Sequence, residues 1–408
     1  MDLNDTPDQA AFRTRVQSWL QEHKADAPPA SGDSGDTAYI DSRRAWQDRL
    51  AEAGYAGLTW PKEFGGQGLG PIEQVITNQE LATARVPGIL DVIGIGMLGP
   101  CLIAHGSDEQ KGRYLGPMLH GDEVWCQLFS EPAAGSDLAA VQTRAVENPD
   151  GSFSLTGQKV WTTNAQFSSY GLLLARTSPD KHKHKGLTMF IVPMDGEGVT
   201  IRGLRQISGE AEFNEVFFTD VRVPDSARLG EEGHGWAVAQ GTLMNERMAI
   251  GGSAARESGM VGKLAALWRE RPDLRRPALH DRLMRLWVEA EAYRMASERQ
   301  RQQLLAGRPG PDGSGSKVTY AQLNQDSTAL ELEVLAAEGL RHDDWSLRRP
   351  TESNWLAGGA THRYLRTKGN SIEGGTSEIL LNVIAERVLG LPREPRTDGG
   401  ASGKDLRR

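Results

Sequence analysis

The 408-residue sequence predicts an α+β protein in which two helical regions enclose a smaller β-sheet region. Residues 8–121 and the residues after Pro224 carry apolar side chains at helical spacing, whereas residues 124–223 contain short β-rich runs. Dinucleotide-binding α/β folds instead alternate strands with helices. The expected parts are an N-terminal helical domain (1–122), a middle small β-sheet domain (123–233), a C-terminal four-helix bundle (234–395) and a flexible tail (396–408).

The N-terminal region contains a Gly-x-Gly-x-x-Gly pattern at Gly94, Gly96 and Gly99. Such a pattern binds a dinucleotide when it joins a strand to a helix and an acidic ribose-binding residue follows. No such frame surrounds these glycines, which lie within a helical region. We therefore predict that they serve helix packing.

In the middle region, turn residues separate the β-rich runs. The segment Asn148-Pro-Asp-Gly is typical of a tight turn between two strands. The basic segment Lys181-His-Lys-His-Lys lies between two further runs, so we expect a solvated hairpin tip there. A secondary role in attracting the phosphates of a bound ligand stays open, because basic charge steers anions.

The C-terminal region shows the helical period most clearly in one segment. Its apolar face consists of Leu283, Leu286, Trp287, Ala290 and Tyr293. Residues 306–316 are rich in Gly, Pro and Ser, and we expect them to form a flexible loop between two helices.

Composition excludes several classes of protein. The formal net charge of -8 argues against a general binder of nucleic acid or anionic membranes. No apolar run approaches the ~20 residues of a membrane-spanning helix, and the acidic start is unlike a signal or transit peptide, so we expect a cytoplasmic protein. With only Cys101 and Cys126, neither a disulfide scaffold nor a zinc site is predicted, and no metal is expected. Redox chemistry would therefore come from a bound organic cofactor.

Two segments of the middle region carry the most specific signal. They read Gln127-Leu-Phe-Ser-Glu-Pro-Ala-Ala-Gly-Ser-Asp and Gly157-Gln-Lys-Val-Trp-Thr-Thr-Asn. A flavin needs an apolar wall, backbone donors for its pyrimidine oxygens and a hydroxyl near the nitrogen that accepts hydride, and these segments supply all three. Either segment alone would also suit an ordinary turn or an ordinary sheet tryptophan. Together, in order and spacing, they resemble the two flavin-domain motifs of the acyl-CoA dehydrogenase family, and the resemblance extends over residues 8–395.

The resemblance implies FAD bound at a subunit interface and assigns site residues. Phe129 and Ser130 would contact the isoalloxazine ring, Trp161 would cover one ring face, and Thr162 and Thr163 would hydrogen-bond its reactive edge.

Further residues follow from the same resemblance. Ser136 would face the acyl-CoA, and Arg247 would also lie at the substrate. Near the end of the chain, the segment Ile372-Glu-Gly-Gly-Thr-Ser-Glu-Ile resembles a family motif, through which Thr376 and Glu378 would join the FAD site.

The implied reaction needs a buried carboxylate that takes the α proton of the substrate. Many family members carry this glutamate where the sequence has Gly374, which cannot act as a base. The family's alternative position, on an earlier helix, corresponds to Glu246, and we predict Glu246 as the base with Glu373 in reserve. Without that frame, Glu246 beside Arg247 would be read as a surface pair. The backbone N–H of Gly374 would still polarise the thioester carbonyl.

The sequence departs from the family pattern at the adenine end of the FAD site. The family's Arg-x-x-Phe-Gly and Gln-x-x-Gly-Gly segments are replaced by Leu274-Arg-Arg-Pro and Leu335-Ala-Ala-Glu-Gly. The whole pattern resembles large subunits of bacterial heteromeric dehydrogenases for steroid side chains or pimeloyl-CoA. Both a homo-oligomer and a heterotetramer with a second dehydrogenase-like subunit stay open.

The leading hypothesis is FAD-dependent dehydrogenation of an acyl-CoA, or of an acyl chain on a carrier protein, to the trans-2-enoyl product. An electron-transfer flavoprotein would then accept the electrons. One alternative is a flavin-dependent oxidase or monooxygenase on the same fold. Another is a flavin-poor structural subunit of a heteromeric dehydrogenase.

Overall fold

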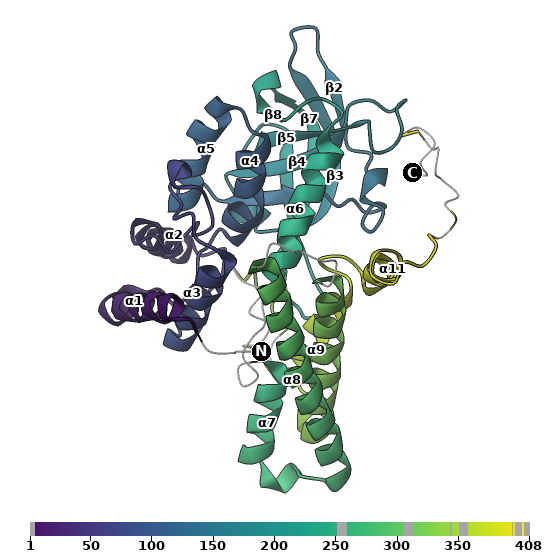
Figure 1. The fold of residues 1–408 in the computed structure, drawn as a ribbon. Helices are drawn as coiled ribbons and strands as arrows, with labels where there is room; N and C mark the ends of the chain where they lie inside the picture. Colours follow the sequence, from purple (N-terminus) through teal and green to yellow (C-terminus); the bar gives the residue numbers. More distant parts are fainter. Residues whose placement is uncertain are drawn as a thin grey trace.

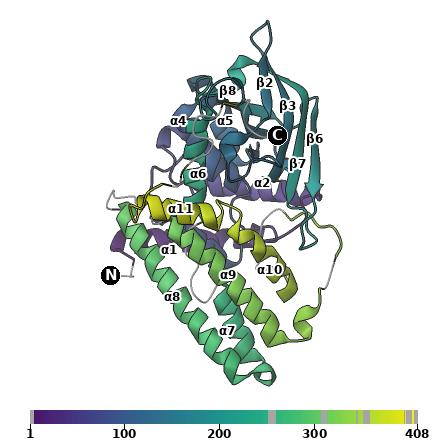
Figure 2. The same cartoon turned by 90° about the vertical axis from the view of Figure 1, so that its right-hand side faces the viewer.

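The structure is a computed structural model that describes residues 5–250, 259–305, 313–342, 345–350, 358–393, 395 and 402–403. For residues 244–250, 301, 304 and 305, within helices, it describes the backbone alone. A helical layer, a twisted sheet and a long helical bundle follow one another along the chain, which confirms the predicted α+β fold (Figure 1). The bundle extends away from the other two parts (Figure 2).

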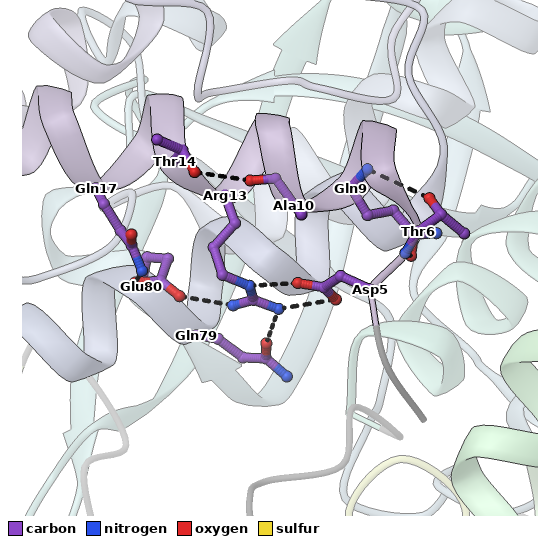
Figure 3. A network of polar contacts seen from close by, with 9 residues as sticks. All are labelled: Asp5, Thr6, Gln9, Ala10, Arg13, Thr14, Gln17, Gln79 and Glu80. Atoms are coloured by element: carbon purple, nitrogen blue, oxygen red, sulfur yellow. Dashed lines mark hydrogen bonds and ion pairs between the residues drawn. The ribbon is translucent and has the colours of Figure 1, made fainter. Parts of the chain in front are cut away.

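The N-terminal layer contains five helices that share one hydrophobic core with one face of the sheet. These are α1 (Pro7–His23), α2 (Thr37–Glu52), α3 (Pro71–Ala84), α4 (Gly99–His105) and α5 (Asp108–His120), with the π-helical η3 (Gly94–Leu98) before α4. Polar contacts join α1 to α3: Arg13 pairs with Glu80 at 2.6 Å and donates to Gln79 at 3.1 Å (Figure 3). These contacts fix two helices of the layer to each other.

The glycine pattern in this layer belongs largely to helix packing, as predicted. A Cβ at Gly94 would lie 2.0 Å from the Asp91 carboxylate, and one at Gly99 would lie 2.0 Å from the Trp60 ring. Gly96 has nothing within 4 Å of its Cβ position, so the packing prediction is wrong for that glycine.

The sheet contains eight strands in the order β6-β7-β3-β2-β4-β5-β8, with β1 paired in parallel to β4. Their bounds are β1 (Trp125–Leu128), β2 (Arg144–Glu147), β3 (Phe153–Thr163), β4 (Tyr170–Arg176), β5 (Leu187–Pro193), β6 (Val199–Leu204), β7 (Phe213–Val223) and β8 (Arg228–Leu229). The predicted turn between β2 and β3 is confirmed: Gly151 has a φ of 81° and donates to the Asn148 carbonyl at 2.9 Å.

Both faces of the central strands are buried. Leu172 and Leu174 belong to the core shared with the N-terminal helices, whereas Leu173 belongs to a second core on the opposite face with Phe190 and Val192. Alternate residues of a strand point to opposite faces, so this continuous apolar run needs cover on both sides.

The segment between β4 and β5 joins two paired antiparallel strands, as predicted, but it is solvated only in part: Lys181 and Lys185 are exposed and the residues between them are not. Lys183 is buried and its Nζ lies 3.1 Å from Asp137, while His184 lies against Trp236 with ring centroids 4.8 Å apart. Residues 402–403 of the expected loose tail also fold onto it, with the Gly403 N–H donating to the Lys181 carbonyl at 3.1 Å. The prediction was wrong for Lys183 and His184, because it treated the whole run as solvent-exposed without regard to nearby acidic and aromatic partners.

The C-terminal part is helical, with α9 in contact with α7, α8, α10 and α11 (Figure 2). The helices are α6 (Gly235–Ile250), α7 (Met260–Glu270), α8 (Pro277–Leu305), α9 (Gly313–Leu335), α10 (Ala360–Thr367) and α11 (Ser377–Arg387). The predicted apolar face is confirmed, since Leu283, Leu286, Ala290 and Tyr293 are buried and Trp287 packs against them.

The expected loop over residues 306–316 is shorter at its end than predicted. Residues 306–312 lie outside the described residues, but α9 already begins at Gly313, and Ser314 and Ser316 are buried within it. Ser316 donates to the Gln300 side chain of α8 at 2.9 Å. Packing against α8 thus overrides the weak helix propensity of Gly and Ser.

None of the helices in the described part of the chain is both long and apolar enough to cross a membrane.

Candidate active site

The two motif segments of the middle region lie side by side in the structure. The Val160 N–H donates to the Ser130 carbonyl at 2.9 Å, which places Phe129 and Ser130 beside the end of β3. Phe129 is buried, whereas Trp161 is 56% exposed and has a φ of 62°. A tryptophan in this uncommon backbone conformation, with its ring accessible, is suited to cover a planar ligand.

A buried ion pair holds these segments together. Lys159 Nζ donates to the Phe129 carbonyl at 2.9 Å and to Glu131 at 2.8 Å. The Glu131 carboxylate also accepts the backbone N–H groups of Gln142 at 2.6 Å and Thr143 at 2.8 Å. The Glu131 carboxylate therefore joins the first motif segment to β3 and to the residues just before β2.

The environment shifts both partners of this pair. Burial lowers the pKa of Lys159 to about 8, although Glu131 opposes the shift. Burial acts to raise the pKa of Glu131, but Lys159 and the hydrogen bonds outweigh it and hold that pKa below its usual value. Both groups therefore stay charged near neutral pH.

Each of the two motif segments contains a buried polar atom that lacks a hydrogen-bond partner among the described residues. Thr162 Oγ1 and Gln127 Oε1 are buried and make no hydrogen bond to any described residue. The Thr162 backbone, in contrast, is fixed, because Asn214 donates to its carbonyl at 3.0 Å. Thr163, the next residue, is partly buried. Buried polar groups normally have partners, and Thr162 directly follows the accessible Trp161, so its hydroxyl is the candidate of the two to hydrogen-bond a flavin.

Ser136 is exposed in the loop that follows the signature. The next residue, Asp137, pairs with Lys183 of the β4–β5 segment. The structure thus brings the expected substrate-facing serine next to the basic segment, an association that the sequence order does not reveal.

The C-terminal motif forms a sharp turn between η9 (Lys368–Ser371) and α11. Gly374 and Gly375 have φ values of 63° and 95°, which glycine adopts without strain. Thr376 is the N-cap of α11 and accepts the Ile379 N–H at 3.3 Å, and Glu378 is exposed in the first turn. Among the described residues, the Gly374 N–H donates to no backbone carbonyl, so it is available to bind a ligand carbonyl.

Two carboxylates were predicted as candidate bases. Glu373 accepts hydrogen bonds from Arg366 at 3.0 Å and from Asn370 at 2.6 Å, so its two oxygens are engaged. Glu246 and Arg247 belong to α6, but their side chains lie outside the described residues. Glu246 follows buried Thr242 by one helical turn on α6, which contacts the sheet, η3 and α9.

The two altered adenine-end segments lie near each other. Arg271, just before Leu274, pairs with Glu338, which follows the Leu335 segment, at 3.0 Å. The two altered segments therefore lie in the same region of the bundle, so the departure from the family pattern at the adenine end is confined to one place in the structure.

Sequence reasoning missed the roles of several residues at the site. Lys159 and Glu131 belong to the two motif segments but received no role from the sequence, although a lysine within a β-rich run can indicate a buried acidic partner. Gln127 carries a similar sign, a polar side chain in the buried strand β1. Arg366 offered no such sign, because its partners come from distant segments. Among the described residues, no cluster of His, Cys, Asp and Glu could hold a metal ion.

Comparisons with known proteins agree with this arrangement. Profiles of the acyl-CoA dehydrogenase N-terminal, middle and C-terminal domains match residues 6–122, 126–221 and 233–389. Acyl-CoA dehydrogenase IpdE1 of Mycobacterium tuberculosis is 37% identical over 94% of this chain and 98% of its own. Acyl-CoA dehydrogenase FadE34 of the same organism is 38% identical over 94% of this chain but only 51% of its own length.

Solved structures show the same fold. The Tcur3481-Tcur3483 steroid ACAD superimposes with a TM-score of 0.79 at 27% identity, over 97% of this chain and 100% of that one. The ChsE4-ChsE5 complex from Mycobacterium tuberculosis gives a TM-score of 0.76 at 28% identity, over 96% and 100% of the two chains.

Proposed function

This chain belongs to the acyl-CoA dehydrogenase family, and we propose that it oxidises the α,β bond of an acyl thioester to the trans-2-enoyl product. It is an oxidoreductase with FAD as its cofactor. The observation that carries the proposal is the accessible Trp161 next to the Thr162 hydroxyl, which has no partner among the described residues. The buried Lys159–Glu131 ion pair holds the segments that carry these residues together.

Each described residue would perform one task. Phe129 and Trp161 would bind the flavin ring, while the Ser130 and Thr162 hydroxyls and Thr163 would hydrogen-bond its polar edge. Bound FAD supplies the acceptor for the β hydrogen, which leaves the substrate as hydride. The chain supplies the remaining chemistry through its bundle.

We assign removal of the α proton to Glu246. Glu373 is the weaker candidate, because Arg366 and Asn370 already occupy its oxygens. The Gly374 N–H would donate to the thioester carbonyl and so stabilise negative charge as the α proton leaves. Ser136 and Arg247 would contact the substrate, and Thr376 and Glu378 would border the FAD site.

Substrate and partners follow from the relatives. Because two structural neighbours are a steroid ACAD and a two-component complex, we propose a bulky acyl-CoA, such as a steroid-derived thioester, and assembly with a second dehydrogenase-like subunit. An electron-transfer flavoprotein would accept the electrons, in the cytoplasm. The functional units would be residues 1–122, 123–233 and 234–395.

The first test is the visible spectrum of the purified protein, followed by anaerobic addition of straight-chain and steroid-derived acyl-CoAs. Bleaching of the flavin band by one thioester is the expected result. Consumption of oxygen with a hydroxylated product would instead support an oxygen-using enzyme. A protein that stays colourless with added FAD, alone and with a candidate second subunit, would contradict the proposal.

The second test assigns the base. Glu246→Gln should slow anaerobic bleaching by about 10²- to 10⁴-fold, because general base catalysis contributes that much, without loss of FAD. Glu289→Gln, on an exposed surface of α8, is the matched control and should bleach at the normal rate. If Glu246→Gln bleaches as fast as this control, Glu246 is not the base.

A further inference from the structure

The direction of the Gly374 N–H depends on anchors outside the turn. Two consecutive glycines at positive φ give the turn no preferred backbone conformation of their own. On the bundle side, Lys317 of α9 donates to the carbonyls of Asn370 at 2.6 Å and Gly375 at 2.8 Å. These bonds fix the turn to α9. They do not fix it to the sheet, which carries the proposed flavin-binding segments, residues 129–131 and 159–163, here called the flavin wall.

Arg366 of α10 makes the connection to the sheet. Its Nη2 lies 2.9 Å from Glu212, just before β7, and 3.0 Å from Glu373 in the turn. Its guanidinium also lies over the Phe213 ring at 5.6 Å, and that ring meets Trp161 edge-on with centroids 5.8 Å apart. A continuous set of contacts therefore joins the turn to the tryptophan of the flavin wall.

This junction is charged although it is buried. The side chains of Arg366 and Glu212 are 6% and 4% exposed, and burial raises the pKa of Glu212 even with the arginine beside it. Apolar residues at a buried contact often stabilise a protein as much as an ion pair does. We therefore read the buried Arg366 ion pairs as a device that defines the geometry of the junction, not one that adds stability. A guanidinium can bind two carboxylates in fixed directions, which an apolar contact cannot do.

We propose that Arg366 is a positioning residue: by binding Glu212 and Glu373 together, it sets the Gly374 N–H at its working distance from the flavin wall. The role of the N–H itself rests on the proposed function. Arg366 does not touch the reacting atoms; its helix, α10, packs against α9, and its side chain reaches Glu212 just before β7.

Arg363 provides a matched control on the same helix. It forms a buried ion pair with Glu331 of α9, so this pair lies within the bundle and does not reach the sheet. Arg366→Gln and Arg363→Gln should both lower the unfolding midpoint of the full chain. Only the first should release the turn.

The test is amide hydrogen exchange of the purified full-length chain without substrate. Arg366→Gln should accelerate exchange in residues 372–376 by about tenfold or more relative to Arg363→Gln, with less acceleration in Arg366→Lys, which keeps the charge. Equal exchange of this segment in the two glutamine variants would overturn the proposal. This outcome does not depend on whether the chain is a dehydrogenase.

A second measurement follows polarisation of a bound thioester. The absorption band of an aryl-acryloyl-CoA shifts to longer wavelength when a hydrogen bond polarises its carbonyl. The wild type and Arg363→Gln should give equal shifts, and Arg366→Gln a smaller one at saturation. An equal shift in Arg366→Gln would contradict the positioning role, whereas failure of the wild type to bind the ester would contradict the proposed function and leave the exchange result to decide on Arg366.

Discussion

The two walls of the proposed site are built in different ways. The flavin wall comes from two short segments, residues 129–131 and 159–163, joined by one strand contact and one buried ion pair. The opposite wall, around Gly374, depends on Lys317, Arg366 and Glu212, which lie far apart in the sequence. The first wall could thus form with the sheet alone, whereas the second requires the sheet and the bundle to meet.

This difference explains why the buried ion pairs of the two walls have different arrangements. At the flavin wall, Lys159 and Glu131 form an ion pair, and each also hydrogen-bonds a backbone group: Lys159 donates to a carbonyl and Glu131 accepts from an N–H. At the opposite wall, Arg366 binds two carboxylates from separate parts of the chain. Removing the ion pair of the flavin wall should therefore lower the folding stability of the chain. Removing Arg366 should instead change the position of the Gly374 turn relative to the flavin wall.

Lys159→Met should have the largest effect on stability. It leaves Glu131 as a buried carboxylate without its cation, and breaking a buried pair in this way costs about 3–5 kcal/mol. Chemical unfolding of the full chain measures the loss. Arg222→Met removes an ion pair with Asp150 in the same sheet, where both partners are more than half exposed, and should cost no more than about 1 kcal/mol. Equal losses in the two variants would show that the flavin wall is not held by its buried pair.

The same pair predicts a dependence on acid. Because the folded state lowers the pKa of Glu131 below its ordinary 4.5, the unfolded chain takes up the proton first as the pH falls. The stabilisation by Glu131 is therefore complete above pH 4.5 and declines as the pH drops toward the folded-state pKa. Unfolding of the wild type and Glu131→Gln between pH 6 and pH 3.5 should show a stability difference that shrinks with acid. A constant difference over this range would argue against an ionised Glu131 in the folded state.

The sequence predicted the three parts of the fold and singled out the two motif segments that form the proposed flavin wall. Both depend on local patterns: helical spacing in α8, short β-rich runs in the strands, and motif residues that are close in the sequence. The buried Lys183 and the early start of α9 were missed, because their partners Asp137 and Gln300 lie in other elements. Tertiary contacts of this kind override the local sequence features, composition and position between β-rich runs, on which the predictions of a solvated tip and a loop were based.

The opposite wall shows the same limit more strongly. Gly374 and its turn could be recognised from the motif around Thr376, but the motif does not say what holds the turn. Arg366 looks like any surface arginine of a helix until Glu212 is placed beside it. Residues that act across a junction between two parts of the chain therefore need the structure to be found.

Thr162→Val should have the smallest effect and tests the flavin wall without breaking it. The Thr162 hydroxyl has no partner among the described residues, so valine, of nearly the same shape, should leave the stability of the FAD-free chain unchanged or slightly raise it. Loss of one hydrogen bond to the flavin should weaken FAD binding about 2- to 10-fold in a fluorescence titration of the FAD-free protein. In Thr188→Val, the matched control, the lost hydroxyl contacts Thr177 and accepts the Gly233 N–H, so stability should fall while FAD affinity stays the same. The reverse pattern, with Thr162→Val unstable and its FAD affinity unchanged, would mean that the hydroxyl serves the fold and not the cofactor.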